Sequence, residues 1–186
     1  VTLCSLGSPV HAQVTSASSF QPIDGQDGQA GLPNRLAGKV GIIERLGTPV
    51  DQVLTFVDEL GADVQLGSVL EGEKPVALVF AYHNCPMLCS LVLDGVAEAI
   101  KSADLRAGAD YEVVVVSVDP KDGPQRASDD KAKYVDQIGD PAVADGMHFW
   151  TVTAETEDQV EKLAESVGFR YAYDVRTGEF AHHASL

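Results

Sequence analysis

Basic residues are scarce in this 186-residue sequence, which has 13 Lys and Arg against 28 Asp and Glu. The formal net charge is therefore −15. Because binding to phosphates requires clustered Lys and Arg, this balance argues against nucleic acid as a partner. It argues against docking on anionic lipid for the same reason. The negative charge permits attraction of a basic partner or a cation, but solubility is the simpler explanation.

Long apolar runs and an initiator Met are also missing. No segment reaches the roughly 18 apolar residues that a membrane span needs. Residues 1–12 are mostly apolar and end in Val10-His11-Ala12, a pattern of small residues that is typical of a signal-peptide cleavage site. We therefore predict that residues 1–12 are the remnant of a signal peptide and that the sequence is a fragment, truncated in its C-terminal strands.

Two alternatives remain for this opening segment. A lipoprotein signal at Cys4 is a poorer match, because Leu3 stands where such signals prefer a small residue. An uncleaved membrane anchor is the other. Each alternative predicts a periplasmic or otherwise extracytoplasmic location, with a tether to the inner membrane as one option.

Cysteines are few as well: there are three, and Cys4 would leave with the signal peptide. The remaining pair is Cys85 and Cys89. A single pair in an exported domain can be a structural staple, so the spacing and the context have to decide its role. The rest of the composition, 45% hydrophobic and 22% charged, is that of an ordinary globular domain.

Strands alternate with helices along most of the chain. Residues 13–33 are rich in Gln, Ser, Gly and Asp, so we assign residues 13–37 to a flexible linker and residues 38–186 to one domain. The predicted elements are a strand pair at 52–57 and 63–66, strands at 76–81, 112–118, 148–152 and 169–173, a helix after the cysteines, a helix at 124–138 ending at Gly139, a helix from a Thr156–Gln159 capping box to Gly168, and a strand beginning at His182. This order predicts an α/β three-layer sandwich with an N-terminal strand pair.

The cysteine pair stands at the first junction between a buried strand and a helix, which is where thioredoxin-like folds keep their site. Pro86 suits the first helical position, and residues four apart share a helix face. Their Cα atoms would lie about 6 Å apart, and the helix N-terminus favours thiolate. The pair can therefore switch between dithiol and disulfide or chelate a soft metal. A purely structural disulfide there would close a tiny loop and stabilise little.

The segment C-P-x-x-C after a buried strand resembles the copper-site segment of the SCO/SenC family. Further landmarks of that family follow in order, so the resemblance covers about residue 32 to the end. They are residues 34–47 ahead of the first strand, Ser117-Val118-Asp119-Pro120, His148-Phe149-Trp150-Thr151 and Val167-Gly168-Phe169-Arg170-Tyr171.

This resemblance implies a thioredoxin-like fold that binds copper, Cu(I) or Cu(II), through two cysteines and one distant histidine. It assigns Cys85 and Cys89 as ligands and favours His182 over His183, because Phe180-Ala181-His182 matches the family's aromatic-Ala-His form. In a strand, adjacent residues face opposite sides, so only one of the two histidines is expected to point at the cysteines. The chemistry is consistent, since two thiolates and an imidazole suit copper.

Other candidate residues carry less weight. His83 is expected to be solvated, His148 to be structural and Met87 to serve packing. Asp119, at the end of a strand, either tunes the cysteines electrostatically or is a solvated loop residue.

The function implied is a metallochaperone that receives copper from a donor protein and delivers it to the copper-site subunit of cytochrome c oxidase. The alternative is an extracytoplasmic thiol-disulfide oxidoreductase that uses Cys85 and Cys89 as a redox pair. Oxidoreductases of the thioredoxin type place a cis-proline opposite their cysteines before a late strand. The last proline here is Pro141, so the sequence favours the metal-binding alternative.

Overall fold

The computed structural model describes residues 35–72, 74–82 and 88–183, with only the main chain described at residues 88 and 89. The chain has the mixed α/β architecture that the sequence predicts. Its elements are β1 (Gly41–Ile42), β2 (Thr55–Val57), β3 (Asp63–Gln65), α1 (Gly67–Leu70), β4 (Val76–Ala81), α2 (Leu88–Ser102), β5 (Glu112–Ser117), α3 (Pro124–Ile138), β6 (Met147–Trp150), α4 (Glu157–Val167), β7 (Phe169–Arg170), β8 (Ala172–Asp174) and β9 (Glu179–Ala181).

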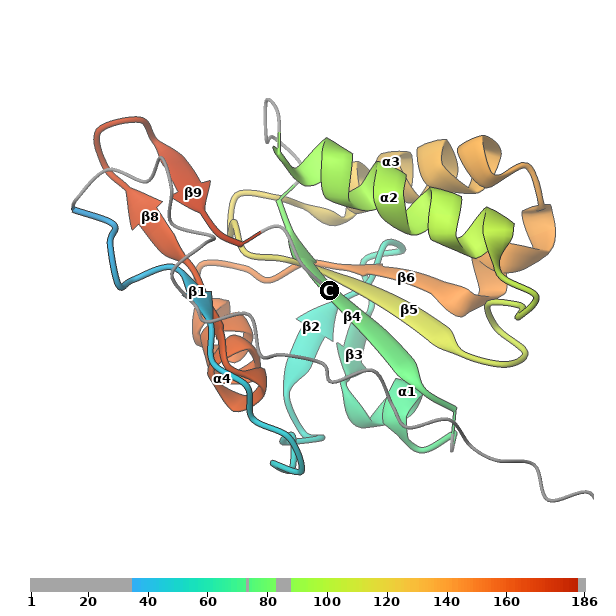
Figure 1. The fold of residues 1–186 in the computed structure, drawn as a ribbon, viewed down its shortest axis with the longest axis horizontal. Helices are drawn as coiled ribbons and strands as arrows, with labels where there is room; N and C mark the ends of the chain where they lie inside the picture. Colours follow the sequence, from blue (N-terminus) through green and yellow to red (C-terminus); the bar gives the residue numbers. More distant parts are fainter. Residues whose placement is uncertain (1–34, 73, 83–87, 184–186) are drawn as a thin grey trace, which may run out of the picture.

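Three parallel strands form the central sheet in the order β4-β5-β6 (Figure 1). Every residue of β5 is buried, and the four valines from Val113 to Val116 each have 1% or less of their surface exposed. A parallel strand covered on both faces needs apolar side chains on both faces. This is why β5 has an unbroken apolar run instead of an alternating pattern.

Helices α2 and α3 pack together on one side of this sheet, and α4 lies on the other side (Figure 1). The apolar stripe predicted for α2 is confirmed, since Leu93, Val96, Ala97 and Ile100 are all buried. Gly139 ends α3 in the left-handed conformation, with φ +81°, as predicted. No helix in the described part of the chain is long and apolar enough to cross a membrane.

The predicted N-terminal strand pair is present as the antiparallel hairpin β2–β3. Phe56 of this hairpin stacks on Trp150 of β6, with ring centroids 5.6 Å apart. The main chains of Val57 and Thr151 also exchange hydrogen bonds of 2.9 and 2.8 Å. The hairpin is therefore attached to the carboxyl end of β6 by both apolar and polar contacts.

The predicted strands at the end of the domain need correction. The single strand expected at 169–173 is divided at Tyr171, because β7 pairs with β1 whereas β8 pairs with β9. The last described strand, β9, ends just before His182, where a strand was expected to begin. Within the described residues, β8 and β9 form a two-stranded sheet separate from the parallel one.

The predicted capping box at the start of α4 is wrong. Thr156 occupies the N-cap position, but its side chain caps no helical N–H; its Oγ1 instead accepts a hydrogen bond from the Thr153 main chain at 2.9 Å. The side chain of Gln159 accepts a hydrogen bond from the Thr55 main chain at 3.3 Å. The side chain of Gln159 therefore connects α4 to β2 and does not take part in capping its own helix.

Gly168 has a left-handed conformation, φ +74°, and a Cβ atom added there would lie 1.8 Å from the main-chain oxygen of Ile43. Gly139 is left-handed as well, but nothing lies within 4 Å of its Cβ position. We expect Gly139→Ala to lower the free energy of unfolding by about 1 kcal/mol, the ordinary cost of a left-handed residue. Gly168→Ala should lower it by at least about 3 kcal/mol, because β1 must also move away. Urea denaturation of both variants checks this, and equal losses would contradict it.

Candidate functional site

The structure places the cysteine pair in part. Cys89 is the second residue of α2, in the first turn of a helix that follows β4. The N-terminus of a helix carries a partial positive charge, which favours a thiolate there. Cys85 lies outside the described residues, as do His11, His83 and Met87. The predicted junction between a buried strand and a helix is therefore present. The strand is β4, and the helix is α2, which carries Cys89.

His182 is buried, with 7% of its surface exposed, and it lies among aromatic rings. Its ring centroid is 6.1 Å from that of Tyr82, in an edge-on arrangement, and 6.2 Å from that of Phe169. Phe180, two residues before it, packs on Tyr82 at 5.7 Å. Because Tyr82 directly follows β4, these contacts hold His182 at the end of β4 from which the chain leads to Cys85 and Cys89.

The surroundings of His182 favour a neutral imidazole. Burial lowers the pKa of His182, although its hydrogen bond to the His183 main chain acts in the opposite direction. Nδ1 lies 3.0 Å from the main-chain oxygen of His183, and since a carbonyl only accepts, Nδ1 carries the proton. In the neutral ring the lone pair is then on Nε2. Metal-binding histidines are commonly oriented by this kind of hydrogen bond to a main-chain carbonyl.

His183 is half-buried, and its Nδ1 atom is buried without a hydrogen-bond partner in the part of the chain that the structure describes. Both histidines follow β9. The sequence argument that His182 and His183 face opposite sides assumed that both lie in one strand, and it therefore does not apply. Burial separates them instead, since the ring of His182 is the more buried one and packs against Tyr82 and Phe169.

His148 is remote from this junction and has a structural environment, as predicted. It lies in β6, and its Nε2 atom is 3.1 Å from Oε2 of Glu112, the first residue of β5. Lys74 forms an ion pair with the other carboxylate oxygen of Glu112. Burial alone would raise the pKa of Glu112, but the hydrogen bonds from Lys74 and His148 prevail and lower it. This cluster lies at the end of the sheet where β5 begins. Helix α2 starts at the opposite end, after the carboxyl end of the parallel strand β4.

Asp119, expected either to tune the cysteines electrostatically or to be a solvated loop residue, belongs to a local turn after β5. Its Oδ1 atom accepts a hydrogen bond from the Lys121 main chain at 3.0 Å. The neighbouring Asp122 is more deeply buried and accepts a hydrogen bond of 2.6 Å from the Ser117 hydroxyl. Asp122 therefore stabilises the loop that follows β5, a role that sequence analysis did not assign.

Sequence analysis also missed Tyr82, which connects the cysteine-bearing junction to the histidine. The signal available for it was weak: a single aromatic residue after an apolar strand, two positions beyond Phe80. Its partners Phe180 and His182 lie far along the chain, so no local pattern could pair them with Tyr82. Within the described residues no three Cys, His, Asp or Glu side chains gather closely enough to hold a metal ion.

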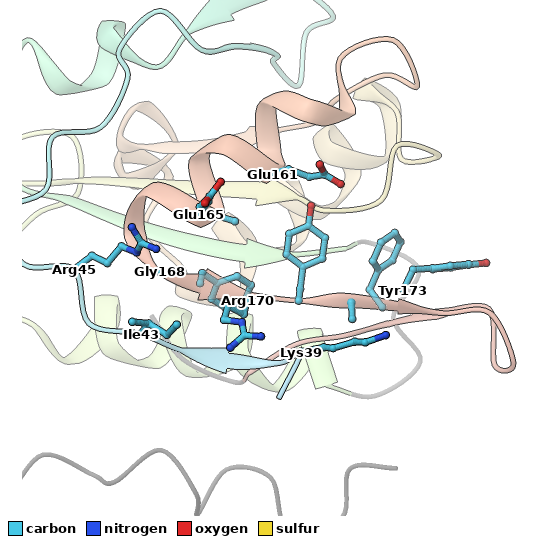
Figure 2. Close-up of a pocket in the computed structure, with 13 residues that line it drawn as sticks. Lys39, Ile43, Arg45, Glu161, Glu165, Gly168, Arg170 and Tyr173 are labelled. Atoms are coloured by element: carbon cyan, nitrogen blue, oxygen red, sulfur yellow. The ribbon is translucent and has the colours of Figure 1, made fainter. Parts of the chain in front are cut away.

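A groove of about 430 Å³ lies between residues 39–45, α4 and the β8–β9 hairpin (Figure 2). Charged side chains from both walls face it, with Lys39, Arg45 and Arg170 on one side and Glu161 and Glu165 on α4. No Cys or His side chain that the structure describes lines it. Phe169, whose ring packs on His182, and Phe180 also line the groove, so it borders the aromatic surroundings of His182.

Comparisons with known proteins agree with this architecture. A family model described as SCO1/SenC matches residues 45–185. A proposed electron transfer protein from Aquifex aeolicus VF5 is 26% identical, with a TM-score of 0.59 over 74% of this chain and 73% of that one. A proposed electron transport protein from the same organism is 26% identical, with a TM-score of 0.50 over 69% of this chain and 74% of that one.

A SCO1/SenC family lipoprotein from Bacillus anthracis str. Ames shares the fold, with 16% identity and a TM-score of 0.55 over 75% of this chain and 77% of that one. No curated protein matches the chain in sequence. The fold is thus shared with solved structures, and the family match spans the described domain from just after β1 onward.

The lowered pKa of Glu112 predicts how Glu112→Gln responds to pH. A carboxylate whose folded-state pKa lies below its ordinary value contributes stability above the unfolded-state pKa, and loses it as pH falls through the folded-state pKa. We expect wild type to exceed Glu112→Gln in free energy of unfolding at about pH 6, and the difference to shrink as the pH falls below the ordinary glutamate pKa of 4.5. Urea denaturation across this range measures the difference.

Glu71→Gln provides the control, since Glu71 is exposed and has no ion pair among the described residues. It should show no such trend. A Glu112→Gln difference that is independent of pH would mean that Lys74 and His148 do not stabilise the carboxylate.

Proposed function

The chain belongs to the SCO1/SenC family, and on that premise we propose that it binds copper and takes part in the assembly of cytochrome c oxidase. Copper is the cargo in this proposal. Its ligands are the thiolates of Cys85 and Cys89 and the imidazole of His182. Two soft thiolates and one imidazole form a donor set that suits copper in either oxidation state.

The observation that carries the proposal is the position of His182. Its ring packs against Tyr82, which stands three residues before Cys85 and seven before Cys89 in the sequence. A metal ligand must be deprotonated on the atom that binds, and burial together with the Nδ1 hydrogen bond to His183 favours a neutral ring with its lone pair on Nε2. The residues present therefore fit a copper ion.

The protein would accept copper from a donor protein and pass it by ligand exchange to the copper-site subunit of cytochrome c oxidase. This copper transfer would take place in the periplasm. That location agrees with the signal-peptide assignment proposed for residues 1–12 and with a tether to the inner membrane. The alternative function is thiol-disulfide exchange, in which Cys85 attacks a partner disulfide and Cys89 resolves the mixed disulfide. The experiments below separate the two.

The first prediction concerns the histidine. His182→Ala should weaken copper binding by at least about 100-fold, because it removes a direct ligand. Thiol-disulfide exchange by the cysteines should continue at the wild-type rate. A chelator competition under anaerobic conditions gives the affinity, and reduction of a model disulfide gives the exchange rate.

His183→Ala is the matched control, since it removes the neighbouring half-buried imidazole. It should leave the affinity within about threefold of wild type, far less than the loss of a direct ligand. Collapse of binding in His183→Ala with little change in His182→Ala would move the ligand to His183.

The second prediction concerns the sulfur ligands. Wild type loaded with Cu(II) should show sulfur-to-copper charge-transfer absorption, and Cys85→Ser should lose it together with tight binding of about one copper per chain. Absorbance and paramagnetic resonance during the titration measure both. Weak copper binding by wild type, with rapid reduction of a model disulfide, would favour the oxidoreductase.

A further inference from the structure

The β8–β9 hairpin, which leads to His182, has few polar ties to the rest of the domain. Its strands pair with each other, from Asp174–Glu179 at the turn to Ala172–Ala181 beside His182. Within the described residues they pair with no strand of the parallel sheet. Ring contacts from Phe180 to Tyr82 and Tyr171 hold the inner face, and Lys121 lies over the Tyr173 ring at 5.8 Å. A charge-assisted, two-armed interaction would fix the orientation of the hairpin more firmly than these contacts do.

Arg35 and Asp174 supply that interaction. The Nε atom of Arg35 donates to Oδ1 of Asp174 at 3.1 Å, and Nη2 donates to Oδ2, so the guanidinium grips the carboxylate with both arms. Asp174 is buried, with 6% of its surface exposed. Of the ion pairs formed by residues that the structure describes, this is the one that joins the hairpin to another part of the chain. Two-armed pairs of this kind fix orientation as well as distance.

Asp174 also shapes the hairpin turn. Its Oδ1 atom accepts a hydrogen bond from the Arg176 main chain at 3.1 Å. Its main-chain oxygen accepts hydrogen bonds from Thr177 and Gly178 at 3.2 and 2.8 Å. Arg35 therefore holds the residue on which the turn is built, and a shift of Asp174 would be passed along the short ladder toward His182.

The segment that carries Arg35 is itself anchored. Leu36 and Val40 are buried, and the guanidinium of Arg170 donates to the main-chain oxygen of Gly38. The segment continues into β1, which pairs with β7, and the Ile43 main chain then donates to Gly168 at 2.8 Å. Figure 2 shows Lys39 and Ile43 of this segment along the same groove as Arg170 and Tyr173. Arg35 thus has a fixed base from which to act on the hairpin.

We propose that the Arg35–Asp174 ion pair is a positioning device that holds the hairpin so that His182 is presented to copper at the cysteine-bearing junction. The proposal rests on the proposed function, because it takes His182 as the ligand. It adds a positioning residue from outside the matched SCO1/SenC region, which begins at residue 45. Arg35 does not touch the metal in this proposal and acts only through the hairpin.

The test combines Arg35→Gln with His182→Ala in the intact protein. Arg35→Gln alone should weaken copper binding about 10-fold, the lower range for loss of a residue that orients a ligand. In the His182→Ala background, Arg35→Gln should change the affinity less than about twofold, because there is no longer an imidazole to position. Arg35→Lys keeps the charge but loses the two-armed grip, and its affinity should be intermediate.

A second readout needs no copper. Main-chain amide hydrogen exchange in residues 172–181 should be about 10-fold faster in Arg35→Gln, while exchange in β5 should not change. Arg176→Gln is the matched control. It also removes one positive charge near Asp174, but the Arg176 side chain forms no ion pair among the described residues, so affinity and exchange should both stay close to wild-type values.

The outcomes separate the two proposals. If His182→Ala weakens copper binding but Arg35→Gln does not, the positioning role is wrong and the proposed function stands. Equal weakening by Arg35→Gln in both backgrounds, or faster exchange in β5 as well, would show a general loss of stability and overturn the positioning role. Copper binding that does not depend on His182 would overturn both, whatever the hairpin exchange shows.

Discussion

The contact of Tyr82 with Phe180 and His182 joins two parts of the molecule that share no strand pairing in the described chain. Tyr82 directly follows β4, the strand that leads to the cysteines, whereas Phe180 lies in β9 and His182 follows it. Every statement about a shared site for Cys85, Cys89 and His182 depends on this packing. This ring packing supplies proximity, and the two-armed Arg35–Asp174 ion pair adds a further constraint on orientation.

Two buried carboxylates, Glu112 at the start of β5 and Asp174 at the hairpin turn, each have a basic partner that lowers the carboxylate pKa, even though burial opposes it. Neither group lies in the aromatic surroundings of His182. Burial lowers the pKa of His182, which favours the neutral imidazole that a metal ligand requires.

The sequence predicted best those elements whose pattern is local. The apolar runs of β4 and β5, the stripe of α2 and the stop at Gly139 follow from burial and from helix geometry within a few residues. It failed where a distant partner decides. Gln159 bonds to Thr55 instead of capping its own helix, and the strand expected at 169–173 divides because β1 pairs with only its first part. The cysteine motif was likewise local, whereas the Tyr82–His182 and Arg35–Asp174 contacts are long-range and left no pattern to find.

A copper carrier has to hold its cargo and also release it, and the location of the ligands bears on both. In the proposed site, Cys85 and Cys89 are only four positions apart in the sequence, whereas His182 follows the separate β8–β9 hairpin and is available only while the hairpin is docked. The apparent dissociation constant is the intrinsic one divided by the docked fraction, so whatever loosens the hairpin weakens binding without changing a ligand. A recipient that competes for the hairpin's contacts could therefore draw copper away by shifting that fraction, with the two thiolates as the last ligands to leave. On this argument the sparse polar attachment of β8–β9 favours transfer, and the few contacts that do fix it set the balance between holding and release.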